Sequence, residues 1–449
     1  MMRDAEAILD QALQIFRDCK VQGGEIYLED HTIFSVGVAS GKIESLETQE
    51  VRGAGLRVFD RGHVAFSYTS DVSVEGLRES ALMAKALLPL SDPDEANRLP
   101  EPDAVSAAEP DIHDPLLARV EPQEKIGIAR RMEEAARAAD TRVTRVRLSR
   151  YTDVMGSAGV AGTAGLRRIW PFTRAYASIE LNAEQGSDMQ SGYYADFAIR
   201  FAGLDPAHVG REAARHAAQK LGAARTPTRR TNLVLEPSVA ASLLESIAPA
   251  LYADNVLKGK SLLGTRAGQT VAAGRVTLLD DGRLPGADHS WPYDAEGVAT
   301  RPTLLIEGGV LKGFLQSAYT SVRMNCAPTG NASRRSFLSP PRIAPSNLYL
   351  QPTGLTREAL MAEAGNGIFI TEVMGLHTID PISGDFSLGA SGLELRAGRL
   401  EGPVDRIGIA GNVLDLLRSI GGVAGDVRLM PGGGAGSTTW LADISVSGT

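Results

Sequence analysis

The chain has 449 residues, of which 43% are hydrophobic and 22% are charged, so we expect a globular protein of two or three domains. Its formal net charge of −8 argues against nucleic-acid binding, which normally needs a basic surface. The sequence has no long apolar stretch, and no basic N-terminal region followed by an apolar core, so it predicts a cytoplasmic protein with no membrane segment.

Residues 1–90 predict an N-terminal α/β unit made of a helix, an antiparallel meander and a second helix. Apolar residues spaced four, three and four apart indicate the first helix over residues 4–20. Short alternating runs within residues 25–70, separated by turn residues, indicate the strands of the meander. Ser73 follows as a candidate N-cap for the second helix.

Residues 91–119 predict a linker, because this segment is polar, acidic and interrupted by prolines. The earlier pattern then recurs over residues 120–223, a second (central) α/β unit. A helix over about 122–139 and strands over about 142–201 come before a helix with Asp205 as its N-cap. The recurrence indicates two units of similar architecture.

A polar break at residues 224–230 comes before the C-terminal domain, which we assign to residues 227–449. The 48 glycines of the chain favour many turns, and hence a high strand content. Short helices are expected in this domain at about 237–252, 356–364 and 411–420. The sequence therefore predicts an α+β fold, in which two helix–antiparallel meander–helix units are followed by a larger, Gly-rich, mainly β domain.

Common catalytic signatures are absent from the sequence. None of the seven histidines is followed by glutamate, so there is no His-Glu-x-x-His zinc motif. The glycine run at 432–436 has Ser437 where a dinucleotide-binding motif needs its last glycine. His208 and His216 share a predicted helix but lie about 12 Å apart along it, too far for one metal ion, and we interpret both as surface residues.

One loop combines a histidine with carboxylates and hydroxyls. It follows a predicted strand and contains His377, Asp380, Ser383 and Asp385. A histidine beside Asp380 or Asp385 could form an acid/base pair, which makes an independent hydrolase one hypothesis. The same residue types are common in turns, where their side chains hydrogen-bond to nearby backbone, and this interpretation is favoured.

Several blocks of sequence occur in an order typical of one protein family. They are Ser261-Leu-Leu-Gly-Thr-Arg266, Pro292-Tyr-Asp-Ala-Glu-Gly297, Thr329-Gly-Asn-Ala-Ser-Arg334, Pro345-Ser-Asn-Leu348, Ile409-Ala-Gly-Asn412 and the segment 371–392. With these blocks the chain resembles the TldD/PmbA family, formerly described as modulators of DNA gyrase, and within it the PmbA (TldE) type. The resemblance covers most of the chain and is strongest over residues 227–420.

The resemblance also implies what this chain lacks. TldD-type members carry a His-Glu-x-x-x-His zinc motif on a helix and a further cysteine ligand near the C-terminus. Aligning that helix puts Leu244 and Pro249 at the histidine positions and keeps only Glu245, and residues 427–431 contain no cysteine. Catalytic zinc needs three protein ligands and an open position. The resemblance therefore implies a subunit with no metal and no catalytic residue of its own.

The function implied by the resemblance is that of a non-catalytic subunit. It would pair with a TldD-type, zinc-bearing metalloprotease subunit as a heterodimer that degrades or processes unfolded peptides. An extended peptide can be held through its main chain at a sheet edge, and we expect contacts from His377, Asp380, Ser383, Asp385 and Asn331. The alternative is a metal-free homodimeric peptide-binding or scaffold protein without enzymatic activity.

Overall fold

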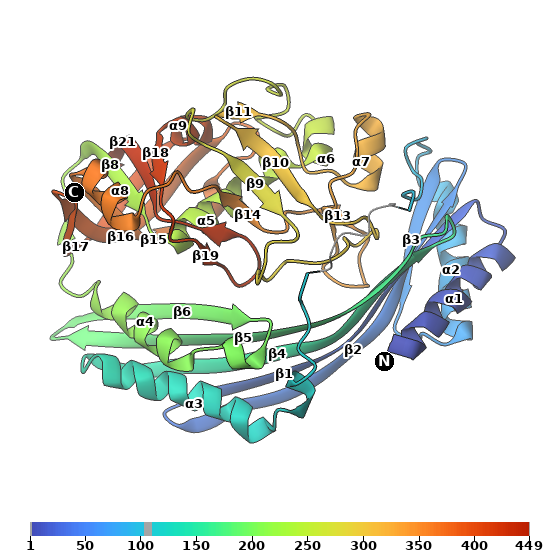
Figure 1. The fold of residues 1–449 in the computed structure, drawn as a ribbon, viewed down its shortest axis with the longest axis horizontal. Helices are drawn as coiled ribbons and strands as arrows, with labels where there is room; N and C mark the ends of the chain where they lie inside the picture. The colour runs from blue at the N-terminus through green and yellow to red at the C-terminus, as the bar shows by residue number, and fades with distance from the viewer. Residues whose placement is uncertain (1, 103–109, 449) are drawn as a thin grey trace.

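The fold is that of a computed structural model, which describes residues 2–102 and 110–448. A long curved sheet with helices on its outer face forms one layer, and the C-terminal domain lies against its inner, concave face (Figure 1). The predicted α+β class is confirmed. No helix among the described residues has the length and apolar character needed to cross a membrane.

The curved sheet contains six strands in the order β3-β2-β1-β4-β5-β6. Their bounds are β1 Gly23–Ala39, β2 Lys42–Asp60, β3 His63–Thr69, β4 Val143–Gly162, β5 Arg167–Gln185 and β6 Asp188–Ala198. The two predicted meanders are therefore halves of one sheet, joined by antiparallel pairing of β1 with β4 from Glu25 opposite Gly162 to Val38 opposite Ser149. This junction leaves β3 and β6 as the two edge strands.

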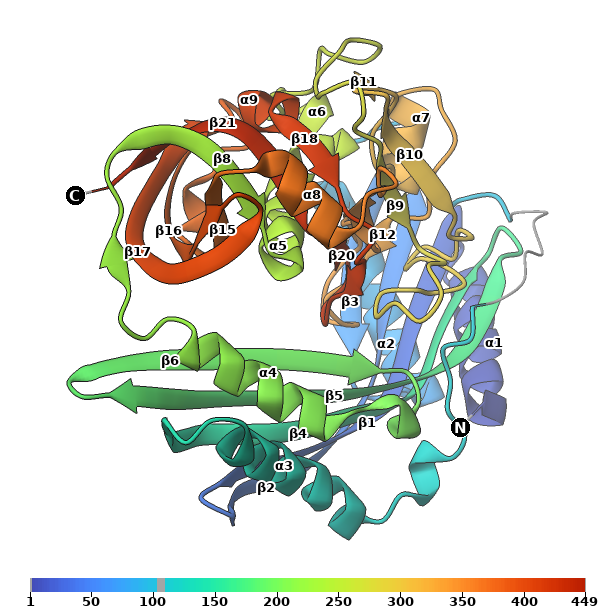
Figure 2. The same cartoon turned by 60° about the vertical axis from the view of Figure 1, so that its left-hand side comes forward.

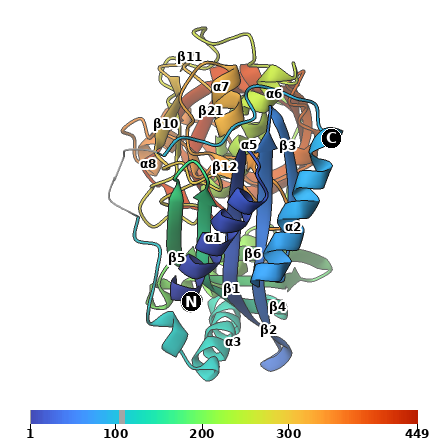
Figure 3. The same cartoon turned by 90° about the vertical axis from the view of Figure 1, so that its right-hand side faces the viewer.

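Four helices cover the outer face of the sheet: α1 Met2–Asp18, α2 Val74–Leu87, α3 Pro122–Ala139 and α4 Pro206–Ala218. α1 and α2 lie side by side at one end of the sheet (Figure 3), α1 against β1, β4 and β5 and α2 against β2 and β3. α3 and α4 pack together at the other end. The predicted N-caps are confirmed, since the side chain of Ser73 accepts from the Gly76 N–H and that of Asp205 from the His208 N–H.

β5 shows how the two faces of the sheet are used. Its odd-numbered residues, among them Ala175, Ile179 and Leu181, are buried in the core that α3 and α4 cover. Since side chains alternate along a strand, its even-numbered residues point to the opposite face, toward the C-terminal domain. The alternation gives this strand one face for the core and one for the interface between domains.

The segment 91–119 is packed against the rest of the protein where it is described, although it holds no regular strand. Ile112 and Leu117 are buried, and the Ile112 carbonyl accepts a hydrogen bond from the Thr173 N–H at 2.9 Å. Short 3₁₀ turns border the segment at Leu88–Leu90 and Leu117–Arg119. The part of this predicted linker at 103–109 lies outside the described residues.

The C-terminal domain is built on a seven-stranded sheet in the order β18-β21-β8-β15-β16-β17-β7. The strands are β7 Ala224–Arg225, β8 Arg229–Leu235, β15 Gly367–Met374, β16 Asp385–Arg396, β17 Arg399–Asn412, β18 Ile420–Val423 and β21 Thr439–Ser447. An additional pairing between β17 and β21 closes the strands from β21 to β17 into a ring (Figure 2).

Smaller elements surround this ring. A four-stranded sheet has the order β11 Val310–Leu311, β10 Pro302–Glu307, β9 Leu278–Asp281 and β14 Leu348–Leu350. Two short strand pairs are formed by β12 Ala332–Ser333 with β13 Arg342–Ile343, and by β19 Arg428–Leu429 with β20 Ala435–Gly436. The helices are α5 Pro237–Ile247, α6 Ala253–Leu257, α7 Ala318–Arg323, α8 Arg357–Ala364 and α9 Val413–Arg418. Further 3₁₀ turns occupy Phe201–Gly203 and Leu376–Thr378.

α5 is shorter than the sequence predicts. One helix was expected over about 237–252, but α5 ends at Ile247 and a 3₁₀ turn, Ala248–Leu251, follows. Pro249 explains the difference, because proline has no N–H to continue the α-helical hydrogen bonds and its ring crowds the preceding turn. The helix nevertheless packs firmly, with Leu243, Leu244 and Ile247 in the largest core cluster.

Candidate functional site

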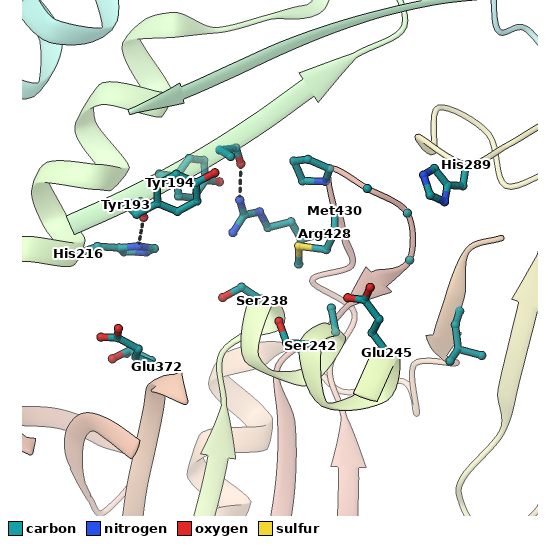
Figure 4. Close-up of a pocket in the computed structure, with 18 of the residues that line it drawn as sticks. Tyr193, Tyr194, His216, Ser238, Ser242, Glu245, His289, Glu372, Arg428 and Met430 are labelled. Carbon is teal, nitrogen blue, oxygen red and sulfur yellow. Dashed lines mark hydrogen bonds between the residues drawn. The ribbon is translucent and has the colours of Figure 1, made fainter. Parts of the chain in front are cut away.

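A cavity of about 710 Å³ separates α4 and β6 from the C-terminal domain (Figure 4). We call it the α5 cleft, because α5 contributes Ser238, Ser242 and Glu245 to its wall. These three residues are spaced four and three apart, which places them on one face of the helix. The opposite wall contains Tyr193 and Tyr194 of β6.

The two positions that the resemblance assigns to zinc-binding histidines do not line this cleft. Leu244 is 6% exposed and belongs to the hydrophobic core, while Pro249 lies in the 3₁₀ turn after α5. Neither side chain has a lone pair to donate to a metal. Over residues 2–102 and 110–448, no three His, Cys, Asp or Glu side chains are grouped so as to hold a metal ion. The residues present therefore do not fit a catalytic zinc.

His216, interpreted from the sequence as a surface residue, lies in the wall of the cleft with its side chain only 16% exposed. Its Nδ1 is 3.0 Å from the Tyr193 carbonyl oxygen, and its Nε2 is 3.7 Å from Oε1 of Glu236, the residue before α5. Arg215 donates from Nη2 to the same oxygen at 3.2 Å. Burial alone would raise the pKa of Glu236, but its contacts with His216 and Arg215 outweigh burial and lower that pKa.

Two further contacts connect the walls of the cleft. The Arg428 guanidinium lies 4.0 Å from the Tyr194 ring centroid and donates to the Ala195 carbonyl at 2.9 Å. Lys220 forms a 3.0 Å ion pair with Glu372. These side-chain contacts therefore join the two walls at two places, and the cavity lies between them.

The edge of β6 is partly occupied by these side chains. β6 is the last strand of the six-stranded sheet, and an edge strand normally offers free backbone groups to a further strand. The carbonyls of Tyr193 and Ala195, two residues apart, already contact His216 and Arg428. A peptide could add to this edge only by displacing them, so the edge favours contact with side chains over simple extension of the sheet.

A second cavity of about 310 Å³ lies further along the concave face of the sheet. We call it the aromatic chamber, because β5 contributes Trp170 and Phe172 and the C-terminal domain contributes Trp291 and Tyr293. The Phe172 and Trp291 rings meet edge to face, with centroids 5.3 Å apart. The chamber is therefore enclosed by rings from both domains.

Buried charges hold the two domains together beside the chamber. Glu25 pairs with Arg57 at 2.5 Å and with Arg334 at 2.6 Å, and Arg57 also reaches Glu296 at 2.9 Å. We call these four residues the buried charge network. Arg334 and Glu296 belong to the sequence blocks 329–334 and 292–297, so these family-typical blocks are interface residues in the structure.

Asn331, a candidate for peptide contact, lies in this interface. It lines the aromatic chamber but is buried, and it donates from Nδ2 to Asp280 at 2.6 Å. Burial raises the pKa of Asp280 to about 6 in spite of this hydrogen bond. Nearby, burial and the charge of Glu296 raise the pKa of Asp294 to about 8.

The loop candidates lie elsewhere. His377, Asp380, Ser383 and Asp385 are exposed, and none of them lines the α5 cleft or the chamber. Asp380 accepts from the Ile382 N–H at 2.7 Å, and Ser383 Oγ accepts from the Asp385 N–H at 3.2 Å. These bonds are turn chemistry, and the described residues show no hydrogen bond between His377 and either aspartate. The geometry supports the turn interpretation.

Apart from Asn331, Glu245 and members of the family-typical blocks, sequence reasoning did not single out the residues that line the cavities. Tyr193, Arg428 and Trp291 come from separate segments that meet only in the folded chain. One signal was available, because Trp170, Phe172 and other even-numbered residues of β5 place large polar or aromatic side chains on a single strand face.

Comparisons with known proteins match three successive segments of the chain. Models of the PmbA/TldA metallopeptidase family match residues 24–88 as domain 1, 115–221 as the central domain and 228–448 as the C-terminal domain. The Metalloprotease PmbA of Escherichia coli O157:H7 is 25% identical over 430 residues, 96% of this chain and 93% of that protein. A Metalloprotease TldD homolog of Buchnera aphidicola is 24% identical over 440 residues, 94% and 89% of the two chains.

Solved structures agree over nearly the whole chain. A crystal structure of a candidate modulator of a DNA gyrase from Thermotoga maritima has a TM-score of 0.89 and 26% identity, and covers 98% of this chain and 100% of that one. TldE from Thermococcus kodakarensis has a TM-score of 0.87, with 99% of each chain covered. Its 20% identity makes this second likeness one of fold alone.

Proposed function

Because the chain belongs to the PmbA/TldD metallopeptidase family, we propose that it is a non-catalytic, PmbA-type subunit of a metallopeptidase complex. A TldD-type partner subunit would carry the zinc and cleave the peptide bond. This chain would hold unfolded peptide in the α5 cleft and complete the enclosure around it.

The observation that carries the proposal is the state of α5. A zinc peptidase needs three ligands and a metal-bound water that a glutamate activates. Leu244 is buried in the core and Pro249 ends the helix, so neither can supply a ligand, and without a bound metal Glu245 has no metal-bound water to activate. The polar face of α5 nevertheless lines a large cavity, which supports a role in binding.

An unfolded peptide suits this cavity chemically. Extended chains expose amide groups that need hydrogen-bond partners, and the cleft offers the hydroxyls of Ser238 and Ser242 with the charged groups of Glu245 and Arg428. Tyr193 and Tyr194 add apolar surface that does not depend on one particular peptide sequence.

The test compares the purified chain with the chain mixed with a TldD-type subunit. We expect the chain alone to hold no stoichiometric zinc by elemental analysis and to leave unfolded casein intact. The mixture should cleave casein, and a chelator should stop the cleavage. About one tightly held zinc per lone chain, or chelator-sensitive cleavage by it, would falsify the proposal. Peptide binding without any effect of the partner would favour the homodimeric scaffold alternative.

A further inference from the structure

The α5 cleft and the aromatic chamber adjoin each other in one continuous interface. His289, Ala344, Pro345 and Ser346 line both cavities. Both also border the concave face of the six-stranded sheet, and a peptide can extend from one cavity to the other along these shared residues.

β5 runs past both cavities. Its even-numbered residues point to the C-terminal domain: Glu180 lines the cleft, while Tyr176, Arg174, Phe172 and Trp170 line the chamber. From 170 to 180 the strand pairs with β4 without a bulge on its own side. At roughly 3.3 Å per residue, Trp170 and Glu180 lie on the order of 30 Å apart, a span that suits an extended peptide of about ten residues. Between them Arg174 and Tyr176 are covered by Asp288 of the C-terminal domain, so such a peptide would follow the shared lining residues and not the face of β5.

The charges around the chamber are already compensated. Arg174 pairs with Asp288 at 3.0 Å, and Glu29 accepts hydrogen bonds from the Tyr27 hydroxyl at 3.3 Å and the Phe337 N–H at 2.8 Å. Arg334, which also lines the chamber, pairs with Glu25 of the buried charge network. An anionic ligand would therefore find both arginines already paired, and burial disfavours a charged ligand of either sign.

The aromatic faces also disfavour a cationic ligand. The guanidinium of Arg174 lies 4.6 Å from the Trp291 ring centroid. Arg168 lies at the same distance from Tyr293, and Arg334 lies 4.9 Å from Tyr27. An ammonium group would have to compete with these arginines for the ring faces. A neutral, ring-shaped group avoids that competition and can pack against ring edges.

One buried donor in the wall is unsatisfied. Trp170 lines the chamber, is 5% exposed, and its indole N–H has no hydrogen-bond acceptor among the described residues. The ring of His31 also makes no hydrogen bond within the described structure, and it lies 6.1 Å from Phe172. A buried donor without an acceptor is unfavourable, so an acceptor brought next to Trp170 would be stabilising.

We propose that the aromatic chamber is a side-chain subsite that selects a large neutral residue, above all an aromatic one, from an extended peptide that reaches it from the α5 cleft. This deepens the proposed function, since the peptide is the one that the α5 cleft is proposed to hold. Selectivity arises because burying an aromatic side chain in the chamber adds binding energy that alanine cannot supply.

The experiment uses the purified full chain and fluorescent peptides of about ten residues. The peptides are rich in glycine and serine and differ at one central position, which is phenylalanine, alanine or lysine. Fluorescence anisotropy should show the phenylalanine peptide binding roughly tenfold or more tightly than the alanine peptide. Equal affinities, tighter binding of the lysine peptide, or no binding of any peptide would overturn the subsite.

Variants that fill the chamber test its location. Val154 and His31 line it from β4 and β1, so Val154→Phe and His31→Phe should reduce the phenylalanine preference to less than about threefold. Thr32→Phe is the matched control, because Thr32 neighbours His31 on the opposite face of β1 and should keep the preference. Thermal melts check that all three variants fold. If both filled variants keep the preference, the subsite is wrong.

The result separates the subsite from the proposed function. Suppose that the chain prefers the phenylalanine peptide, that Val154→Phe and His31→Phe lose this preference, and that adding a TldD-type subunit gives no casein cleavage. The subsite would then be retained and the metallopeptidase role rejected. The opposite result is cleavage of the fluorescent peptides by the mixture at one rate, whatever their central residue, and at the same rate with Val154→Phe. This result would retain the metallopeptidase role and reject the subsite.

Discussion

Glu236 connects the two walls of the α5 cleft through individual contacts. It precedes α5 and receives contacts from Arg215 and His216 of α4, the helix on the other side of the cleft. Since these contacts lower the pKa of Glu236 below its ordinary value, its ionised form stabilises the folded state. At the scale of single residues, the shape of the cleft therefore depends on a carboxylate that must stay charged.

We predict that Glu236→Gln lowers the free energy of unfolding by about 1–3 kcal/mol near pH 7. A depressed folded-state pKa gives stability that is present above the unfolded pKa, about 4.3 for glutamate, and that is lost as the pH falls through the folded value. The difference between wild type and variant should therefore shrink in urea unfolding below about pH 4.

Glu372→Gln is the matched control for that measurement. Glu372 also crosses the cleft, to Lys220, but its side chain is 47% exposed, so its loss should cost less than about 1 kcal/mol. Equal losses for the two variants, or a difference for Glu236→Gln that grows in acid, would contradict the assignment.

Among the elements, the hairpin formed by β19 and β20 closes the wall where the cleft meets the chamber. Gly432, Gly433 and Gly434 make its turn, and all three have positive φ angles, of 87°, 97° and 79°. Gly433 lies against His289: a Cβ there would be 2.5 Å from the His289 Nδ1 and 2.8 Å from the Ser346 carbonyl oxygen. The turn thus sets the position of a residue that lines both cavities.

We predict that Gly432→Ala and Gly433→Ala differ in effect. A Cβ at Gly432 meets no atom within 4 Å, so Gly432→Ala carries only the strain of a positive φ, about 1–2 kcal/mol. Gly433→Ala adds the clash with His289 and should cost more in chemical unfolding. It should also weaken peptide binding. Equal stabilities for the two variants would show that the hairpin adjusts freely.

The sequence predicted the helices and meanders well, because apolar spacing and caps such as Ser73 and Asp205 are local signals. It did not predict that β1 and β4 join the two meanders into one sheet, since this pairing brings together residues more than a hundred positions apart. Pro249 indicated that α5 ends early, but the apolar spacing continues on both sides of this proline and favoured one longer helix.

The candidate site was harder to predict than the fold. The loop with His377 and Asp385 attracted attention because its chemistry is visible in consecutive residues, but the structure uses that chemistry to form turns. The α5 cleft instead forms where β5, β6, α4 and α5 meet, and the chamber forms where β1, β4 and β5 meet the C-terminal domain. No single segment shows either meeting. The even-numbered face of β5 was the one local indication.

For the whole molecule, the buried charge network decides how the C-terminal domain lies on the sheet. Arg334 is fully buried, and with Arg57 it faces Glu25 and Glu296, so two positive and two negative charges cancel. Buried ion pairs add little net stability when complete, but losing one member leaves an uncompensated charge in the interior. We therefore expect the network to favour one arrangement of the domains, and with it the shape of both cavities.

This balance predicts a non-additive result for variants of Glu25 and Arg334. Glu25→Gln or Arg334→Met alone leaves one unpaired charge and should lower the free energy of unfolding by about 3–5 kcal/mol. The double variant removes one charge of each sign and leaves Arg57 paired with Glu296 at 2.9 Å, so it should cost clearly less than the sum of the two. Urea unfolding of all four proteins completes the cycle. Additive losses would mean that the two side chains act separately, and the domain arrangement would then depend on the aromatic contacts around Trp291 instead.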